Sequence, residues 1–395
     1  MRRFVLFIVV VTAFVLVPWP ATAEPPARLA CGATVTTDTK LTSDLSNCPD
    51  NGLVIGADGI TLDLNGHTVG GDSAPVVSCP ADTICNSGIS NIGHHDVSIK
   101  GGTVQGFGIG VLFTRASQYR IQRIRATSNA DLGILVSQST RSRVDHSSSS
   151  GGVNGLVIVE STNMRLDHNA VTGAQGFAIL VAQGSSRSRV DQNVLDGNEN
   201  GILLLESRDI TVRGNRVSHS SGAAIDIEQA NGNHVSANVL TSSGDGVILT
   251  EAHGNQISDN SVTGTGFFGF PDTGGFGVIL DGAEDNLIQR NTVTGGRGPA
   301  ILVSTLDSEN TSKRNTVASN VVNSKLDSGI VVNNNATANG DDGIHVDAAG
   351  TTVTRNTANH NLDLGIQAVP AVIDGGGNTA RGNGNPAQCV NVLCR

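Results

Sequence analysis

Apolar and polar residues alternate with a period of two in short runs along most of the chain. Ile202 and Leu204 form one such pair, and Ile225 and Ile227 form another. The runs are four to six residues long, and Gly, Asn and Ser separate them. A period of two in short runs is typical of β-strands, whereas helices need longer runs with a period near 3.6. The pattern therefore predicts an all-β chain of many short strands.

One phrase recurs from about residue 100: Gly-Ile-x-Leu, a few turn residues, then Asn-x-Val-x-x-Asn. Most copies begin 22 or 23 residues after the previous one, and such a period indicates a solenoid. Each unit holds two or three short strands, as in one coil of a parallel β-helix, with coils stacked about 4.8 Å apart. The repeats are aligned on Gly108, Gly133, Gly155, Ala178, Gly201, Ala224, Gly246, Gly277, Ala300, Gly329, Gly343 and Gly365.

The interval from Gly329 to Gly343 is too short for a full coil. Two explanations stay open: Val332 and Asn335 form the asparagine-corner strand of a contracted coil, or the alignment slips there.

Two longer units carry insertions, at 264–272 and 306–313. One insertion comes before a predicted strand and the other follows the next strand, so we expect two loops flanking one sheet. Loops beside a rigid floor are where solenoids usually bind ligands.

An asparagine recurs three residues after an inward-facing apolar residue. Asparagine tolerates the left-handed backbone of a sharp corner, and stacked amides can bond to one another. Equivalent copies predict a structural column rather than one active site. Its members are Asn169, Asn193, Asn215, Asn238, Asn260, Asn291, Asn320 and Asn356.

The repeat and the opening phrase Ile60–Val69 (ITLDLNGHTV) resemble the right-handed parallel β-helix repeat proteins of the pectate-lyase-like superfamily, in particular the secreted group labelled NosD-like. The resemblance implies a single-stranded right-handed parallel β-helix of roughly 12–13 coils. It does not fix an activity, because the superfamily includes lyases, hydrolases, uronate epimerases, binding proteins and adhesins. The catalytic motifs of its polygalacturonases, pectate lyases and mannuronan epimerases do not occur here, so no catalytic residue is carried over.

The first residues are typical of a signal peptide. Arg2 and Arg3 precede an apolar run that ends at Val17, and Ala21-Thr22-Ala23 forms a cleavage site. We expect a leader at 1–23, a cap region at 24–58, the β-helix at 59–369 and a C-terminal cap at 370–395. No other segment has the roughly 20 apolar residues of a membrane span, so we expect a secreted protein.

Charge and cysteine content agree with export. The net charge is −10, or −12 without the leader, which disfavours nucleic acid as a partner. Six cysteines lie near the two ends, and an oxidising compartment favours disulfides over metal binding. Sequence proximity favours the pairs Cys31–Cys48, Cys79–Cys85 and Cys389–Cys394 as caps.

The outward position of the Gly-Ile-x-Leu strand is mostly apolar. Two explanations stay open: the β-propensity of these residues, or a stripe covered by a partner or a second copy of the chain. Asp226 and His345 interrupt it. The column reads Leu135, Val157, Leu180, Leu203, Asp226, Ile248, Ile279, Leu302, Val331 and His345.

Carboxylates gather where the predicted loops flank the sheet. Like charges at close range raise one another's pKa, as a general acid or a cation site requires. The candidate catalytic residues are Asp226, Glu228, Asp245, Glu251 and Asp281. The candidate substrate-binding residues are Phe267, Phe268, Phe270, Asp272, Glu206 and His345.

Three further patterns favour structure over chemistry. Gln138, Glu160, Gln183, Glu206, Gln229 and Glu251 predict an amide–carboxylate ladder, although its glutamates also approach the spacing of an inverting glycosidase pair. Arg143-Val144-Asp145, Arg165-Leu166-Asp167 and Arg189-Val190-Asp191 predict a salt-bridge ladder rather than a polyanion groove. His146 with His168, and His94-His95-Asp96, lack the further ligands of a metal site.

The sequence thus predicts a secreted β-helix that binds a polysaccharide along its sheet face. If it is an enzyme, we expect a polysaccharide lyase, glycoside hydrolase or uronate epimerase. The alternative is a non-catalytic structural or adhesive solenoid that self-associates through the apolar column as a homo-oligomer. No cofactor is expected, and neither calcium nor copper has support in the sequence.

Overall fold

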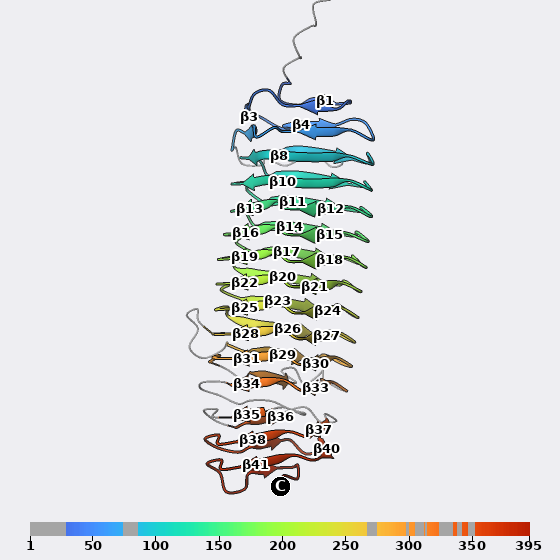
Figure 1. The fold of residues 1–395 in the computed structure, drawn as a ribbon. Coiled ribbons are helices and arrows are strands. Elements are labelled where there is room, and N and C mark those ends of the chain that lie inside the picture. Colours follow the sequence, from blue (N-terminus) through green and yellow to red (C-terminus); the bar gives the residue numbers. More distant parts are fainter. Residues whose placement is uncertain are drawn as a thin grey trace, which may run out of the picture.

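The computed structural model shows stacked coils in which strands far apart in sequence lie side by side (Figure 1). No helix occurs in the part of the chain that the structure describes, and so none that could span a membrane. The described residues are 29–73, 86–266, 275–297, 300–304, 312, 314–323, 335–337, 342–346 and 352–395. The predicted leader at 1–23 lies outside them.

Between residues 33 and 323, three parallel sheets form the stack, and each described coil contributes to all three sheets. Sheet A has twelve strands: β1 (Ala33–Val35), β4 (Leu53–Ile55), β7 (Ser87–Ile92), β9 (Ile109–Thr114), β11 (Leu132–Ser137), β14 (Asn154–Val159), β17 (Phe177–Ala182), β20 (Asn200–Leu205), β23 (Ala223–Glu228), β26 (Asp245–Thr250), β29 (Val278–Asp281) and β32 (Ile301–Ser304).

Sheet B follows sheet A in each coil, and sheet C follows sheet B. Sheet B contains β2 (Thr39–Lys40), β5 (Thr61–Asp63), β8 (Ser98–Gln105), β10 (Arg120–Thr127), β12 (Arg143–Asp145), β15 (Arg165–Asp167), β18 (Arg189–Asp191), β21 (Thr211–Arg213), β24 (His234–Ser236), β27 (Gln256–Ser258), β30 (Leu287–Gln289) and β33 (Thr316–Ala318).

Strands β8 and β10 continue from sheet B into sheet C. The other strands of sheet C are β3 (Leu45–Cys48), β6 (Thr68–Gly71), β13 (Ser148–Ser150), β16 (Ala170–Thr172), β19 (Val194–Asp196), β22 (Arg216–Ser218), β25 (Val239–Thr241), β28 (Ser261–Thr263), β31 (Thr292–Thr294), β34 (Val321–Asn323), β35 (Asn335–Thr337), β38 (Thr357–Asn359) and β41 (Thr379–Arg381). Near the C-terminus, β36 (Ile344–Val346), β39 (Ile366–Ala368) and β42 (Cys389–Val390) form one small sheet, and β37 (Thr352–Thr354) and β40 (Ile373–Gly376) another.

The core is a stack of aliphatic side chains supplied by all three sheets. In one coil, Ile202 and Leu204 come from β20, Val212 from β21 and Val217 from β22, and each is at most 1% exposed. Each inward residue lies over its equivalent in the next coil, as Ile202 lies over Ile225. The period-two alternation therefore places one apolar set inside, which confirms the predicted all-β solenoid of about 13 turns.

The register agrees with the sequence alignment except at its ends. Gly133 pairs with Gly110 and not with Gly108, because Leu132 and Ile134 pair with Ile109 and Val111. Within the short interval that begins at Gly329, β35 pairs with β34. Asn335 is the first residue of β35, whereas the corner asparagines directly precede their strands.

The predicted asparagine column forms a continuous hydrogen-bonded ladder. Asn193, Asn215 and Asn238 are each 1% exposed, and each side-chain amide donates to the Oδ1 atom of the next. The asparagines themselves do not have the expected left-handed backbone. The preceding residue has it, as at His168 (φ 56°) before Asn169, because the asparagine side chain must point inward to join the ladder.

Disulfides fasten both ends of the described structure. Cys31 pairs with Cys48 beside the first coil, with Cα atoms 5.3 Å apart. Cys389 pairs with Cys394 at the C-terminal end, with Cα atoms 6.2 Å apart. Both pairs were predicted, and the third, Cys79–Cys85, lies outside the described residues.

Candidate functional site

The outer face of sheet A carries the predicted apolar column in register. Leu180 pairs with Leu203, Leu203 with Asp226, and Asp226 with Ile248. Although these side chains point away from the core, Leu203 is only 5% exposed, because stacked side chains of neighbouring coils cover it. Asp226 is therefore a carboxyl group set between two aliphatic side chains.

This setting changes the acidity of Asp226. Burial, together with the nearby carboxylates of Glu228 and Asp245, raises the pKa of Asp226 to about 6, although a hydrogen bond from the Ile227 N–H lowers it. A raised pKa from burial and like charge is the environment of a general acid. The catalytic role of Asp226 stays a prediction.

Glu228 lies on the same outer face of β23, two residues after Asp226. The rise of a strand places their Cα atoms roughly 6.6 Å apart. Glu228 pairs with Thr250, and Thr250 pairs with Asp281 of β29. The structure therefore brings Asp226, Glu228 and Asp281 onto one face, with Asp281 two coils from Glu228.

Asp245 also belongs to this neighbourhood, but its carboxylate has structural partners. It is paired with Ala223, three residues before Asp226 on β23. Its Oδ1 atom accepts hydrogen bonds from the N–H groups of Gly275 and Phe276, both at 2.9 Å. Asp245 therefore anchors the segment that leads into β29.

Glu206 and Glu251 lie at the corner after sheet A, in the amide–carboxylate column. Every residue of this column has a left-handed backbone, with φ of 48° at Glu206 and 49° at Glu251. The Nε2 atom of Gln229 donates to Glu251 at 2.9 Å, and that of Gln138 donates to Glu160 at 2.8 Å. These contacts form two pairs of the predicted ladder, and Glu206 occupies the equivalent corner of its own coil.

Of the remaining candidates, one lies in β36 and the others lie outside the described residues. His345 lies in β36, where its Nδ1 atom is 3.2 Å from the carboxylate of the buried Asp342. Phe267, Phe268, Phe270 and Asp272 lie outside the described residues, as do 306–311 of the second insertion. The predicted flanking loops therefore stay predictions.

The arginine and aspartate columns of sheet B pair as predicted in two coils. Arg120 donates to Asp145 through two nitrogens, at 2.7 and 2.8 Å, and Arg143 binds Asp167 in the same way. Asp145 and Asp167 are 1% and 0% exposed. Burial raises the pKa of Asp167, but the hydrogen bonds from Arg143 and His168 outweigh it and hold the pKa below its usual value.

The histidines of this region are partners of the ladder. The Nδ1 atoms of His146 and His168 lie 2.9 and 3.0 Å from Asp145 and Asp167. Their rings stack with centroids 5.0 Å apart. His94 contacts Asp58 at 3.2 Å. Each histidine thus has a local acidic partner in the described structure.

Sheets, corners and inward ladders together define a right-handed parallel β-helix with a polar interruption on one face. The family model described as "Right handed beta helix region" matches residues 42–195 and 272–391. These segments cover well over half of the sequence, so the chain belongs to this family.

A second family model, "Periplasmic copper-binding protein (NosD)", matches residues 177–273. Copper sites use Cys, Met or several His ligands, and this segment has no Cys or Met. Its histidines are His219, His234 and His253, and the described residues contain no group of three His, Cys, Asp or Glu side chains placed to hold a metal. The described residues therefore do not fit a copper site.

Solved structures with the same fold are distant in sequence. A mutant of the periplasmic alginate epimerase AlgG is 12% identical, with a TM-score of 0.54, over 88% of this chain and 77% of that one. A tailspike mutant of E. coli bacteriophage HK620, in complex with a hexasaccharide, is 12% identical, with a TM-score of 0.50, over 91% of this chain and 73% of that one. At this identity they show the shared fold. A search of curated protein sequences gave no match.

Proposed function

We propose that this chain is an exported carbohydrate-active β-helix that binds a polysaccharide across the outer face of sheet A, over Asp226, Glu228 and Asp281. The observation that carries the proposal is Asp226, whose pKa of about 6 lies within reach of neutral pH. The AlgG epimerase and the hexasaccharide-bound tailspike support the proposal, because their shared fold accommodates saccharides. Two disulfides and the predicted leader support export.

The chemistry of this face favours hydrolysis of a glycosidic bond. Protonated Asp226 donates its proton to the leaving oxygen, and the carboxylate of Glu228 stabilises the positive charge that develops on the anomeric carbon. A water molecule then adds to that carbon and gives its proton to the Asp226 carboxylate, which restores the acid. A carboxyl group with a raised pKa beside a second carboxylate is suited to these two roles. Strands β20, β23, β26 and β29 contain no Lys or Arg, so nothing on them would neutralise a uronate. A neutral glycan therefore fits this face better than a polyuronate.

The test uses the purified full chain on a panel of neutral and uronate-rich polysaccharides, with release of reducing ends and of unsaturated ends as two separate readouts. Activity should appear as reducing ends from a neutral glycan and fall as the pH rises above about 6. Asp226→Asn should lower turnover by at least about 100-fold while retaining the bound glycan. Asp131→Asn, an exposed position beside β11 on the same sheet, is the matched control and should retain activity. Absence of both turnover and glycan retention across the panel would overturn the proposal.

A further inference from the structure

The salt-bridge ladder of sheet B ends abruptly at β21. Arg143, Arg165 and Arg189 stack in register, and the next residue of this column is Thr211. The neighbouring column is aspartate up to Asp191, and the next residue is Arg213. The sequence pattern Arg-x-Asp thus becomes Thr-x-Arg in a single coil.

This change opens a hollow in the surface of sheet B. Thr211 is short where an arginine would continue the column, and Gly214 has no side chain at the following corner. The hollow has a volume of about 460 Å³ and is lined by Arg165, Arg189, Asp191, Gln192 and Arg213, besides these two residues. This size lies within the range of small-molecule sites, about 300–1,000 Å³.

The hollow contains positive charge that the protein does not neutralise. Among the described residues, no carboxylate lies within 4.0 Å of the guanidinium of Arg189 or Arg213. Arg143, earlier in the same column as Arg189, is instead bound by Asp167. Arg165 also binds Asp167, with Nε and Oδ1 3.0 Å apart, and makes no ion pair with Asp191. Arg189 and Arg213 therefore share only Asp191 as a nearby carboxylate in the lining of the hollow, in a chain whose net charge is −10.

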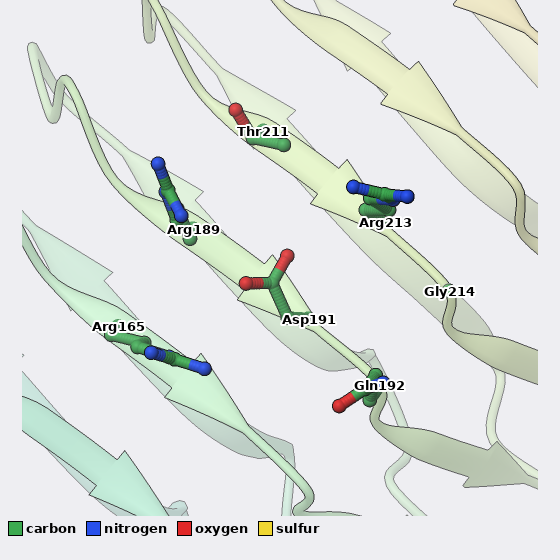
Figure 2. Close-up of a pocket in the computed structure, with 7 residues that line it drawn as sticks. All are labelled: Arg165, Arg189, Asp191, Gln192, Thr211, Arg213 and Gly214. Carbon is green, nitrogen blue, oxygen red and sulfur yellow. The ribbon is translucent and has the colours of Figure 1, made fainter.

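Figure 2 shows this arrangement: Arg165, Arg189 and Arg213 project from three successive strands, with the carboxylate of Asp191 between them. Burial raises the pKa of Asp191, and the adjacent Asp167 adds to the rise, in spite of the three arginines. The guanidinium groups of Arg189 and Arg213 have no carboxylate within 4.0 Å among the described residues and remain available to an outside anion.

We propose that this hollow binds an acidic saccharide, whose carboxylate or sulfate is held by Arg189 and Arg213 while its hydroxyl groups bond to Asp191, Gln192 and Thr211. Guanidinium groups recognise planar oxyanions through paired, charge-assisted hydrogen bonds. Asp191 disfavours a bare anion, because its own charge repels one, but its carboxylate accepts hydrogen bonds from hydroxyl groups. A hydroxylated oxyanion satisfies both kinds of group. This site lies on a different sheet from Asp226 and does not depend on the function proposed above.

The test is calorimetric titration of the full chain with three probes: a galacturonate trimer, a sulfated disaccharide, and a neutral maltotriose of matched size. Binding of an acidic probe and not of maltotriose is expected, and the acidic probe that binds identifies the oxyanion. Arg189→Gln and Arg213→Gln should each weaken binding at least about tenfold and reduce its salt dependence. Arg290→Gln is the control, because this exposed arginine is held by Asp259 at 2.8 and 2.9 Å, and it should bind like the parent chain.

Two further variants separate the possible outcomes. Asp226→Asn should leave this binding unchanged, so failure here is distinguishable from failure of the sheet A proposal. Asp191→Asn should strengthen binding of inorganic sulfate, because it removes the repelling charge. The ratio of the sulfate dissociation constant to that of the acidic saccharide should therefore become smaller. Equal binding of maltotriose, binding unaffected by both arginine variants, or sulfate binding as tight as that of the acidic saccharides would each overturn the proposal. Melting temperatures of all variants confirm that they are folded.

Discussion

The side-chain amide of Asn193 donates a hydrogen bond to the Oδ1 atom of Asn215 at 2.9 Å, and the main-chain N–H of Asn193 donates to the same oxygen at 2.9 Å. The Asn215 amide in turn donates to the carbonyl oxygen of Val190 and to Asn238. Each buried asparagine in this run therefore satisfies groups in the coils on both sides of it. A buried polar network of this kind stabilises a structure only while every member is present.

Asn215→Ala should therefore destabilise the chain strongly. The substitution leaves two donors of Asn193 and the carbonyl of Val190 without a partner in the dry core, and each such group costs about 1–3 kcal/mol. We expect a loss of about 3 kcal/mol or more, measured by urea denaturation. Asn231→Ala is the control: Asn231 is exposed and accepts one hydrogen bond, from the N–H of His253 at 2.9 Å. Equal losses for both variants would show that the ladder adds nothing to stability.

The asparagine column was predictable from sequence because its position relative to the inward apolar residue is constant. The left-handed corner residue was not, since the positions before these asparagines include His168, Gln192, Gly214 and Ala237, which share no residue type. Only a glycine such as Gly214 gives a visible signal there. Side-chain periodicity thus fixed the coil register, while the backbone conformation that closes each coil depends on the packing of its neighbours.

The candidate sites divide in the same way. The repeat period of 22 or 23 residues places Asp226 between Leu203 and Ile248 in neighbouring coils. The acidic face could therefore be predicted from the sequence. The hollow beside Arg213 could not, because the same Arg-x-Asp pattern gives a closed salt bridge at Arg143 and an open one at Arg189. That difference depends on which carboxylate each guanidinium reaches. The change to Thr211 and Arg213 was its only signal in the sequence.

Asp167→Asn should destabilise the chain more than an equivalent change at the surface. Asp167 is fully buried and binds Arg143, Arg165 and His168. The substitution leaves the partly exposed guanidinium groups without their acceptor, a loss of about 1–3 kcal/mol. Because its pKa is lowered, the contribution of this carboxylate is present at neutral pH and is lost as the pH falls below about 4. The difference between Asp167→Asn and the parent should therefore shrink in acid.

The control for this substitution is Asp259→Asn. Asp259 makes the same two-nitrogen contact with Arg290, but the two side chains are 48% and 51% exposed. Surface ion pairs contribute little, so the denaturation midpoint should stay within error of the parent. A large loss at Asp259 would contradict the assignment of stability to the buried part of the ladder.

Asp226 should make the free energy of unfolding depend on pH in the direction opposite to that of Asp167. Its pKa in the folded chain is about 6, above the ordinary value of 3.8, so the folded state binds the proton more tightly than the unfolded state. The free energy of unfolding should therefore fall as the pH rises from about 4 to 6. Asp226→Asn removes this penalty and should stabilise the chain by about 1–3 kcal/mol at pH 7.5, with no gain at pH 4. A gain that is equal at both pH values would exclude titration of Asp226 as its cause.

The Cys31–Cys48 disulfide should protect the first coils. It closes a loop of 17 residues, against 5 for Cys389–Cys394, and longer loops gain more from a cross-link. Cys31→Ser with Cys48→Ser should lower stability by about 2–4 kcal/mol and speed amide exchange in β1 and β4. The double serine variant at Cys389 and Cys394 should have the smaller effect. Unchanged exchange in β1 and β4 would mean that packing alone closes that end.

Self-association through the outer column of sheet A needs exposed apolar area, and the column offers little. Val157 and Leu203 are each 5% exposed, and Leu135, Leu180 and Ile248 are half-buried, because neighbouring coils cover them. Interaction patches usually present several hundred Å². We therefore expect a monomer in sedimentation equilibrium. Val157→Lys should lower the melting temperature, since an ammonium group replaces a methyl packed between Leu135 and Leu180, without changing the mass. Val194→Lys, at a position 48% exposed on sheet C, should change neither quantity. A parent dimer that Val157→Lys dissociates and Val194→Lys preserves would instead establish the column as an interface.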